Sequence, residues 1–459
     1  MKRKLLVALL ALSCIFCFAF GLAACANTGN GNGSLDYLPP NPPPADGEPQ
    51  YEGPGMKQPE VLLDYELNED EKGYTVTGIG SATGSTLKIP SVYNGLPVTA
   101  IGEGAFTENT QLQIVILSEY IKTIENDAFS YCSELISLSI PDNVTYIGIS
   151  AFAGCSGLLN INIGTGVTEI GANAFSNCAI VKMTIPGNVQ TIGANAFSSC
   201  TSLKQVKIES GVKSIGKRAF LFCTALNNLE MGSGVEFIGE SAFEGCTALT
   251  KAKIPNGLIK IETSAFKDCT SLARISIPFV GSWNPEVPVP TPDPENPDDE
   301  EPIVSFFGHI FGAISSTTQN DSIPSSLKTV EITGGNIIRK GAFNMITAIE
   351  NIYITEGVTI LDESSIIGIW NLKTLVIGTC VKTIRSQAVF GGERPQAIYY
   401  MGTSAEWNKI KPPETDSDGS RSNDDLLLPT RYYYSENAPT ESGNFWHFVD
   451  GEPVIWKNN

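Results

Sequence analysis

Histidine is almost absent from this sequence: His309 and His447 are the only two among 459 residues, and each lies among aromatic residues. No histidine therefore accompanies the eleven cysteines, which argues against a Cys/His nucleophile pair. The sequence also lacks a P-loop, an H-E-x-x-H pattern and a G-x-S-x-G pattern. Acidic pairs such as Asp298-Asp299 lie in a proline-rich stretch, which is typical of a solvated linker. The chain is therefore predicted not to be an enzyme and to use no cofactor and no catalytic metal.

Basic residues are also few, because 30 Lys and Arg stand against 49 Asp and Glu. Three of the basic residues, Lys2, Arg3 and Lys4, lie at the N-terminus, and without them the formal net charge is about −22. Such a surface is soluble and self-repelling. It argues against nucleic acid as a partner and against general adhesion to anionic membranes.

A long apolar run, Leu5 to Phe20, follows the basic start and ends in Leu22-Ala23-Ala24-Cys25. A basic start, an apolar run and small residues together indicate a secretory signal over residues 1–25. The last four residues resemble a bacterial lipobox, which implies that Cys25 is lipidated and that the chain meets the membrane through this anchor only. An uncleaved anchor or an ordinary signal peptide is the alternative. Residues 26–60, rich in Gly, Asn, Pro and Asp, are predicted to be a disordered spacer.

One pattern recurs through the middle of the chain. Phenylalanines recur every 22 or 23 residues, at Phe106, Phe129, Phe152, Phe175, Phe197, Phe220, Phe243 and Phe266. Cysteines follow three residues after the later ones, at Cys132, Cys155, Cys178, Cys200, Cys223, Cys246 and Cys269. A fixed period of this length is the signature of a solenoid.

Each period contains a segment of the type Leu-x-x-Ile-x-Ile, with other apolar residues at these positions in several periods, and its alternation predicts a short strand. In the period that begins at Leu158, Ile161 and Ile163 are predicted to point inward, and Asn160 and Asn162 outward. Stacking the periods buries the inward residues and forms a parallel sheet with strands about 4.8 Å apart. The predicted fold is therefore a β-rich repeat solenoid.

Two residue types in the period need a structural explanation. Glycine follows the second Ile in most periods, as at Gly148 and Gly171, which suits either a positive φ or a close approach of two coils. Glu125 and Glu262 occupy the same place, so positive φ is not strictly required.

The side chains of the stacked cysteines point in the same direction, which is unfavourable for disulfides. They are predicted to be buried free thiols, with a metal–thiolate array as the alternative.

The order of segments follows from where this pattern starts, breaks and ends. Residues 61–105 are predicted to be an N-terminal cap that contains a hairpin from Asp64 to Gly80. Regular repeats follow over 106–282. Residues 283–326 are interpreted as an irregular repeat with an acidic, proline-rich insertion at 283–302, and a true domain boundary is the alternative. Degenerate repeats over 327–398 and an aromatic C-terminal cap over 399–459 complete the chain.

The stretch "LKQVKIESGVKSIGKRAFLFC", from Leu203 to Cys223, resembles the BspA-like, or treponemal-type, leucine-rich repeat family. The resemblance extends in degenerate form over about residues 60–459. It implies a leucine-rich repeat solenoid with terminal caps, in a bacterial lipoprotein on the outer face of the cell membrane. Some members of the family are associated with adhesion.

The outward strand positions are predicted to form one exposed concave face. On it the pattern places five basic side chains, Lys182, Lys207, Lys251, Lys253 and Arg274, with Glu230 as the interruption. This strip is predicted to bind an anionic partner, either a protein or an anionic glycan such as a wall polymer; a solvated face with nothing bound is the alternative. The resulting function is binding or adhesion through the solenoid face. The alternative function is a structural component of the cell envelope without a soluble ligand.

Overall fold

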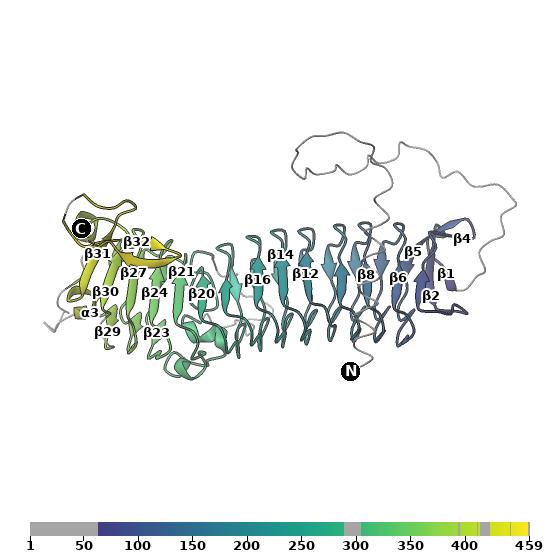
Figure 1. Cartoon of the computed structure of the whole chain (residues 1–459), viewed down its shortest axis with the longest axis horizontal. Coiled ribbons are helices and arrows are strands. Elements are labelled where there is room, and N and C mark those ends of the chain that lie inside the picture. The colour runs from purple at the N-terminus through teal and green to yellow at the C-terminus, as the bar shows by residue number, and fades with distance from the viewer. Residues whose placement is uncertain are drawn as a thin grey trace, which may run out of the picture. The chain divides into compact units, whose positions relative to one another are not determined.

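The structure is a computed structural model that describes residues 63–288, 304–392, 395–410, 412–413, 423–440 and 442–457. In these ranges the chain winds through about 13 turns with a spacing of about 23 residues, and parallel strands stack turn upon turn (Figure 1). The predicted parallel-sheet solenoid is therefore confirmed. The predicted signal over 1–25, the spacer over 26–60 and Cys25 lie outside the described residues. The limits of the caps and of the irregular repeat stay predictions.

The Leu-x-x-Ile-x-Ile segments form the long-strand side of the solenoid. Its strands are β3 (Thr86–Lys88), β6 (Ile114–Ile116), β8 (Ser137–Ser139), β10 (Asn160–Asn162), β12 (Lys182–Ile185), β14 (Gln205–Ile208), β16 (Asn228–Met231), β18 (Lys251–Lys253), β20 (Arg274–Ile277), β21 (Thr329–Ile332), β24 (Asn351–Ile354), β27 (Thr374–Ile377) and β30 (Ala397–Tyr400). Within three successive sheets, from β3 to β10, from β12 to β16 and from β18 onward, neighbours pair in parallel and in register, so that Lys182 lies beside Gln205 and Gln205 beside Asn228. Met183 and Ile185 are buried while Lys182 and Thr184 are exposed, which confirms the period-two alternation.

A second side of each turn consists of strands that, after the first two, are only two residues long. They are β2 (Tyr74–Gly78), β5 (Leu96–Ile101), β7 (Thr123–Ile124), β9 (Tyr146–Ile147), β11 (Glu169–Ile170), β13 (Thr191–Ile192), β15 (Ser214–Ile215), β17 (Phe237–Ile238), β19 (Lys260–Ile261), β22 (Ile337–Ile338), β25 (Ile360–Leu361) and β28 (Thr383–Ile384). At the N-terminal end, β1 (Asp64–Leu67) runs antiparallel to β2, which confirms the predicted hairpin. A second hairpin joins β4 (Val92–Tyr93) to β5.

The phenylalanines and cysteines occupy the third side. The eight phenylalanine rings from Phe106 to Phe266 stack with centroids 5.0 to 5.3 Å apart. Each cysteine of this region donates its thiol to the carbonyl oxygen of the phenylalanine in the preceding turn, as Cys155 does to Phe129 at 3.1 Å. All seven thiols are free and buried, as predicted. Further along, this side contains β23 (Phe343–Asn344), β26 (Ile366–Ile367) and β29 (Val389–Phe390).

The long-strand side continues past the acidic insertion without a missing rung, because β20 pairs directly with β21. The residues on either side of the insertion lie next to each other, because the Ser282 N–H donates to the Val304 carbonyl at 2.8 Å. On the third side, the short 3-10 helix η2 (Phe307–Phe311) lies between two turns: the Phe266 N–H donates to the Ile310 carbonyl, and Phe307 lies 5.1 Å from the Phe343 ring. The side chains of Phe307 and Phe311 are buried in this irregular turn.

The recurrent glycine is explained by close approach of the coils. A Cβ atom on Gly171 would lie 2.6 Å from the carbonyl carbon of Gly148, and the φ of neither residue is positive. Positive φ is instead adopted at other places in the turn, as by Asn173 and Asn177 with φ of 56° and 57°. Asparagine tolerates this left-handed conformation better than most residues.

Replacing Gly171 by alanine is therefore expected to destabilise the solenoid, because the new methyl group meets backbone that cannot rotate away. Overpacking of this kind costs about 1–3 kcal/mol, measurable as a lower midpoint of chemical denaturation. Gly187 is the matched control, because a Cβ atom there would have its nearest neighbour at 3.6 Å. A G171A protein as stable as G187A would contradict the close-approach explanation.

A second short 3-10 helix, η3 (Gln319–Asp321), follows η2 in the irregular turn. The last segments extend the long-strand side and then fold back. They comprise α2 (Ser404–Trp407), α3 (Asp424–Leu427), β31 (Thr430–Tyr434), β32 (Phe445–Val449) and β33 (Glu452–Ile455). β31 pairs in parallel with β30 and β32 with β31, whereas β33 returns antiparallel to β32. Among the described residues, no helix combines the length and the apolar composition that crossing a membrane would require.

Candidate ligand-binding face

The outward side chains of the long-strand side form two parallel rows, which together are called the polar face. Between β8 and β20 the first row contains Ser137, Asn160, Lys182, Gln205, Asn228, Lys251 and Arg274, and the rows continue on the strands before and after. The second row contains Ser139, Asn162, Thr184, Lys207, Glu230, Lys253 and Ser276. Strand pairing places Lys251 beside Arg274 and Lys207 beside Glu230. The structure thus brings all five predicted basic residues onto one face, as their spacing requires.

Lys207 has carboxylates on two sides. Its Nζ lies 3.6 Å from Glu209 Oε1, and Glu230 is its partner in the neighbouring strand. Both members of the Lys207–Glu209 pair are about half exposed, so water screens their attraction and the pair contributes little to stability. Lys207 is therefore a partly neutralised member of the strip.

Arg274 differs from the lysines because the chain itself occupies its guanidinium. Nη1 lies 2.8 Å from Glu452 Oε1, and Nη2 lies 3.6 Å from Glu331 Oε2. The guanidinium also lies over the Tyr353 ring, with its Cζ 5.3 Å from the centroid. In the described structure, Arg274 is an internal anchor rather than an unoccupied cation.

The carboxylate that binds Arg274 belongs to the hairpin of β32 and β33, which lies on the polar face (Figure 1). Trp446 is fully buried in a second, small apolar core with Tyr353, Val376 and Tyr399. The Tyr353 hydroxyl donates to Glu452. Burial, and then the Glu452 carboxylate, raise the pKa of Tyr353 well above its ordinary value.

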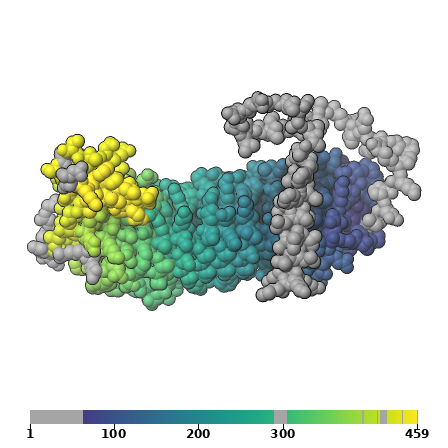
Figure 2. Space-filling model, in the orientation of Figure 1, coloured from purple at the N-terminus to yellow at the C-terminus, as the bar shows by residue number. Residues whose placement is uncertain are grey.

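The hairpin divides the polar face into an open part and a covered part. Figure 2 shows the C-terminal segment in yellow lying over the green turns, whereas the blue-green turns present their long-strand side. In the covered part, Ser276 is only 6% exposed and Tyr353 only 1%. The open part extends from β3 to β18, where the outward residues are polar, basic or aliphatic.

Lys204 belongs to the open part, although the strand alternation did not indicate it. It precedes β14, and its N–H donates to the Val181 carbonyl at 2.8 Å, which places it beside the turn of Lys182. Lys204 and the next residue, Gln205, are both exposed, because the alternation begins only with the strand. Within the described ranges, Lys182, Lys204, Lys251 and Lys253 form no ion pair with a carboxylate. These four lysines are called the basic patch.

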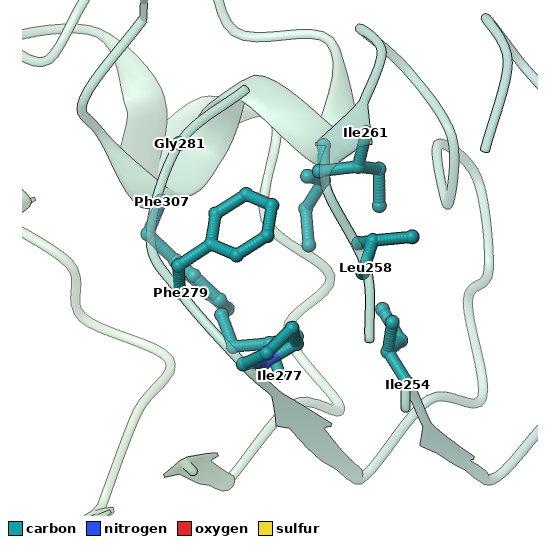
Figure 3. A pocket seen from close by; sticks show the side chains of 9 residues that line it. Ile254, Leu258, Ile261, Ile277, Phe279, Gly281 and Phe307 are labelled. Atoms are coloured by element: carbon teal, nitrogen blue, oxygen red, sulfur yellow. The ribbon is translucent and has the colours of Figure 1, made fainter. Parts of the chain in front are cut away.

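Among the described residues the enclosed pockets are small, and two wider spaces open to the solvent: one of about 870 Å³ beside β1, β2, β5 and β7, and one of about 510 Å³ around Lys207 and Glu230. The pocket in Figure 3 lies where the chain turns into the irregular coil, and apolar side chains such as Leu258, Phe279 and Phe307 surround it. Its free volume of about 10 Å³ is at the lower limit for one water molecule. In the part of the chain that the structure describes, no cluster of three or more His, Cys, Asp and Glu side chains is placed to hold a metal ion. The polar face is the candidate site because the predicted basic residues gather on it.

The stacked short strands, the ladders of identical residues and the exposed strand face define a leucine-rich repeat solenoid. A sequence profile of the BspA type leucine-rich repeat region matches in six copies, over residues 85–204, 190–280 and 320–394. These ranges cover more than half of the chain, which therefore belongs to the BspA type leucine-rich repeat family. Proteins of this family are generally found at the cell surface and are not known as enzymes.

Solved structures of three bacterial proteins are similar to this chain. A leucine-rich repeat protein from Bacteroides ovatus is 20% identical, with 77% of this chain and 98% of that chain covered and a TM-score of 0.43. A leucine rich cell surface protein from Faecalibacterium prausnitzii is 23% identical, with 78% and 97% covered and a TM-score of 0.40. The leucine-rich repeat protein of T. pallidum is 29% identical, with 47% and 91% covered and a TM-score of 0.36. A search of curated proteins found no match.

Proposed function

We propose that this protein is a surface-displayed binding protein whose open polar face contacts an anionic partner. The observation that supports the proposal is the basic patch, four exposed lysines without a carboxylate partner in the described structure, on a chain with a net charge of −19. A local cation cluster on an otherwise acidic molecule attracts an anionic surface at that place, whereas the rest of the molecule repels such a surface. The fold supplies a rigid, extended support for such a contact.

Display outside the cell follows from the N-terminal sequence and belongs to the same proposal. Residues 1–25 direct export, a lipid on Cys25 holds the protein at the outer face of the membrane, and residues 26–60 separate the solenoid from it. Several acyl chains anchor a protein stably, whereas one chain binds only marginally. Mass spectrometry of the membrane-extracted protein tests this step: a lipid-modified peptide that begins at Cys25 is expected, and an unmodified N-terminus would contradict it.

Charge reversal tests the role of the face. The variant K182E/K204E/K251E/K253E is expected to lose at least about tenfold in affinity for two anionic probes, an oligogalacturonate and an oligoglutamate with six carboxylates each. The control K72E/K122E/K382E/K409E has the same net charge and changes four exposed lysines outside the polar face. Equal loss in both variants would show that only net charge matters and would contradict the proposal.

Where the partner is found, on host material or on the bacterium itself, distinguishes adhesion from a structural role in the envelope. Binding of the purified protein is measured to immobilised mucin, to extracellular matrix proteins and to the cell wall of the producing bacterium. Binding to mucin or matrix that the basic-patch variant loses supports adhesion. Binding to the bacterium's own wall alone would instead assign the protein to the envelope structure.

A further inference from the structure

We infer that the partner of the polar face is an extended polypeptide with an apolar part and an acidic part, rather than a polysaccharide. This inference rests on the proposed function and specifies its ligand. Three observations carry it: an aliphatic patch continuous with the basic patch, a polypeptide already seated on the same face, and the length of the open surface.

The aliphatic patch lies on the turns just before the basic patch. It consists of Ile114, Ile116, Ile136, Leu159 and Val181. Ile116 is 48% exposed and Val181 37%, and the other three are partly exposed. Of the described apolar side chains that pack partly buried against the main core, none belongs to this patch. Its residues therefore present apolar surface to the solvent.

Backbone hydrogen bonds make the two patches continuous. The N–H groups of Leu159, Val181 and Lys204 each donate to the carbonyl of the equivalent residue one turn earlier, at 3.0, 3.2 and 2.8 Å. Ile136, Leu159, Val181 and Lys204 thus follow one another along the rim of the face, with Lys182 next to Val181. Contiguous exposed apolar residues beside charged ones are typical of a protein-binding surface. A polysaccharide has no aliphatic side chains that could contact the aliphatic patch on the turns of β6, β8, β10 and β12.

The chain itself provides an example of a polypeptide bound to this face. The hairpin of β32 and β33 places the apolar Trp446 against Val376 and Tyr399, and the carboxylate of Glu452 against Arg274. Apolar contact and carboxylate recognition therefore occur side by side on the covered part of the face. The open part offers the same two chemistries, with the aliphatic patch in place of the aromatic core and the basic patch in place of Arg274.

The length of the open surface sets the length of the ligand. From β6 to β18 there are seven strands, at a spacing of about 4.8 Å, so the two patches together extend over about 29 Å. An extended peptide advances about 3.3 Å per residue. A segment of about nine or ten residues, apolar in one half and acidic in the other, therefore matches both patches.

Three synthetic probes test the inference on the full chain by isothermal titration. The first is a ten-residue peptide, Leu-Ser-Leu-Ser-Leu-Glu-Ser-Glu-Ser-Glu, used together with its reversed sequence. The second replaces the leucines by serine, and the third is a trigalacturonate with the same three carboxylates. One of the two leucine peptides is expected to bind at least tenfold more tightly than the serine peptide and the trigalacturonate, because only it buries the aliphatic patch.

Two variants separate the contributions of the patches. L159S/V181S is expected to lower the affinity for the leucine peptide to that for the serine peptide, while K182E/K204E weakens the binding of all three probes. Should L159S/V181S prove unstable in thermal denaturation, S137L replaces it, since it extends the aliphatic patch and is expected to strengthen leucine-peptide binding only.

The outcomes distinguish this inference from the proposed function. Trigalacturonate bound as tightly as the leucine peptide would overturn the inference and identify a glycan site. So would equal affinities for the leucine and serine peptides. In both cases a loss of binding in K182E/K204E would leave the proposed function intact. Binding of every probe unchanged in K182E/K204E, or absent from the wild-type protein, would overturn both.

Discussion

Between about pH 9 and pH 12 the protein is expected to lose stability much more steeply than an ordinary domain. Burial raises the pKa of six thiols in the ladder, and for three of them, Cys132, Cys200 and Cys269, the pKa rises to about 12. The other three, whose pKa is raised well above the ordinary value, are Cys178, Cys223 and Cys246. An unfolded chain releases these protons near pH 9, whereas the folded chain retains them.

The sign of the effect follows from this difference in bound protons. A raised pKa in the folded state means that the stabilisation is complete below the unfolded pKa and is lost as the pH rises toward the folded pKa. Each thiol contributes about 1.4 kcal/mol per pH unit. Six thiols that act together therefore lower the free energy of unfolding by up to about 8 kcal/mol per pH unit.

Chemical denaturation at a series of pH values from 8 to 11 measures this slope. In the variant C200A/C223A/C246A three of the six thiols are removed, so the part of the slope above pH 9 that comes from the thiols is expected to fall to about half. Tyrosines and lysines ionise in the same range but are unchanged in the variant, and they cancel in the comparison. An equal slope in the two proteins would show that the ladder thiols are not the groups responsible.

Replacing Phe197 by alanine is expected to destabilise the protein by about 3–5 kcal/mol, because the ring is fully buried in the middle of the stack. Its centroid lies 5.3 Å from that of Phe175 and 5.2 Å from that of Phe220, so the substitution interrupts a continuous aromatic column. In a solenoid each turn contacts mainly its neighbours. The defect is therefore expected to uncouple the two halves of the array.

Two readouts measure this effect. Circular dichroism is expected to show an earlier or a two-step thermal transition, and hydrogen exchange is expected to rise first around the turn of Phe197. Phe237 is the matched control, because it is 39% exposed on the short-strand side. F237A is expected to cost less than about 1 kcal/mol. A single unshifted transition in F197A would contradict the nearest-neighbour description of stability.

The features that repeat from turn to turn could be predicted from the sequence, because the same residue pattern occurs in many turns. The strand alternation, the free thiols and the outward direction of the lysines all follow from one period. The reason for the recurrent glycine stayed open, since sequence alone cannot separate positive φ from close approach. The φ values at Asn173 and Asn177 and the contact between Gly171 and Gly148 decide for close approach.

The features that do not repeat escaped prediction. Glu452 lies 178 residues after Arg274, and nothing periodic connects the two. The aromatic C-terminal segment was interpreted as a cover for the last turn, whereas the hairpin of β32 and β33 also covers several turns of the polar face. Lys204 was missed because it lies one residue before its strand, where the alternation does not yet apply.

The central claim is that the open part of the polar face binds the partner and that the covered part does not. The most direct test compares K251E/K253E with R274E for affinity toward oligoglutamate and for thermal stability. The account predicts that K251E/K253E loses at least about tenfold in affinity at an unchanged melting temperature, and that R274E keeps its affinity but melts earlier, because it loses its contacts with Glu331 and Glu452. The opposite pattern, with affinity lost in R274E and retained in K251E/K253E, would contradict it.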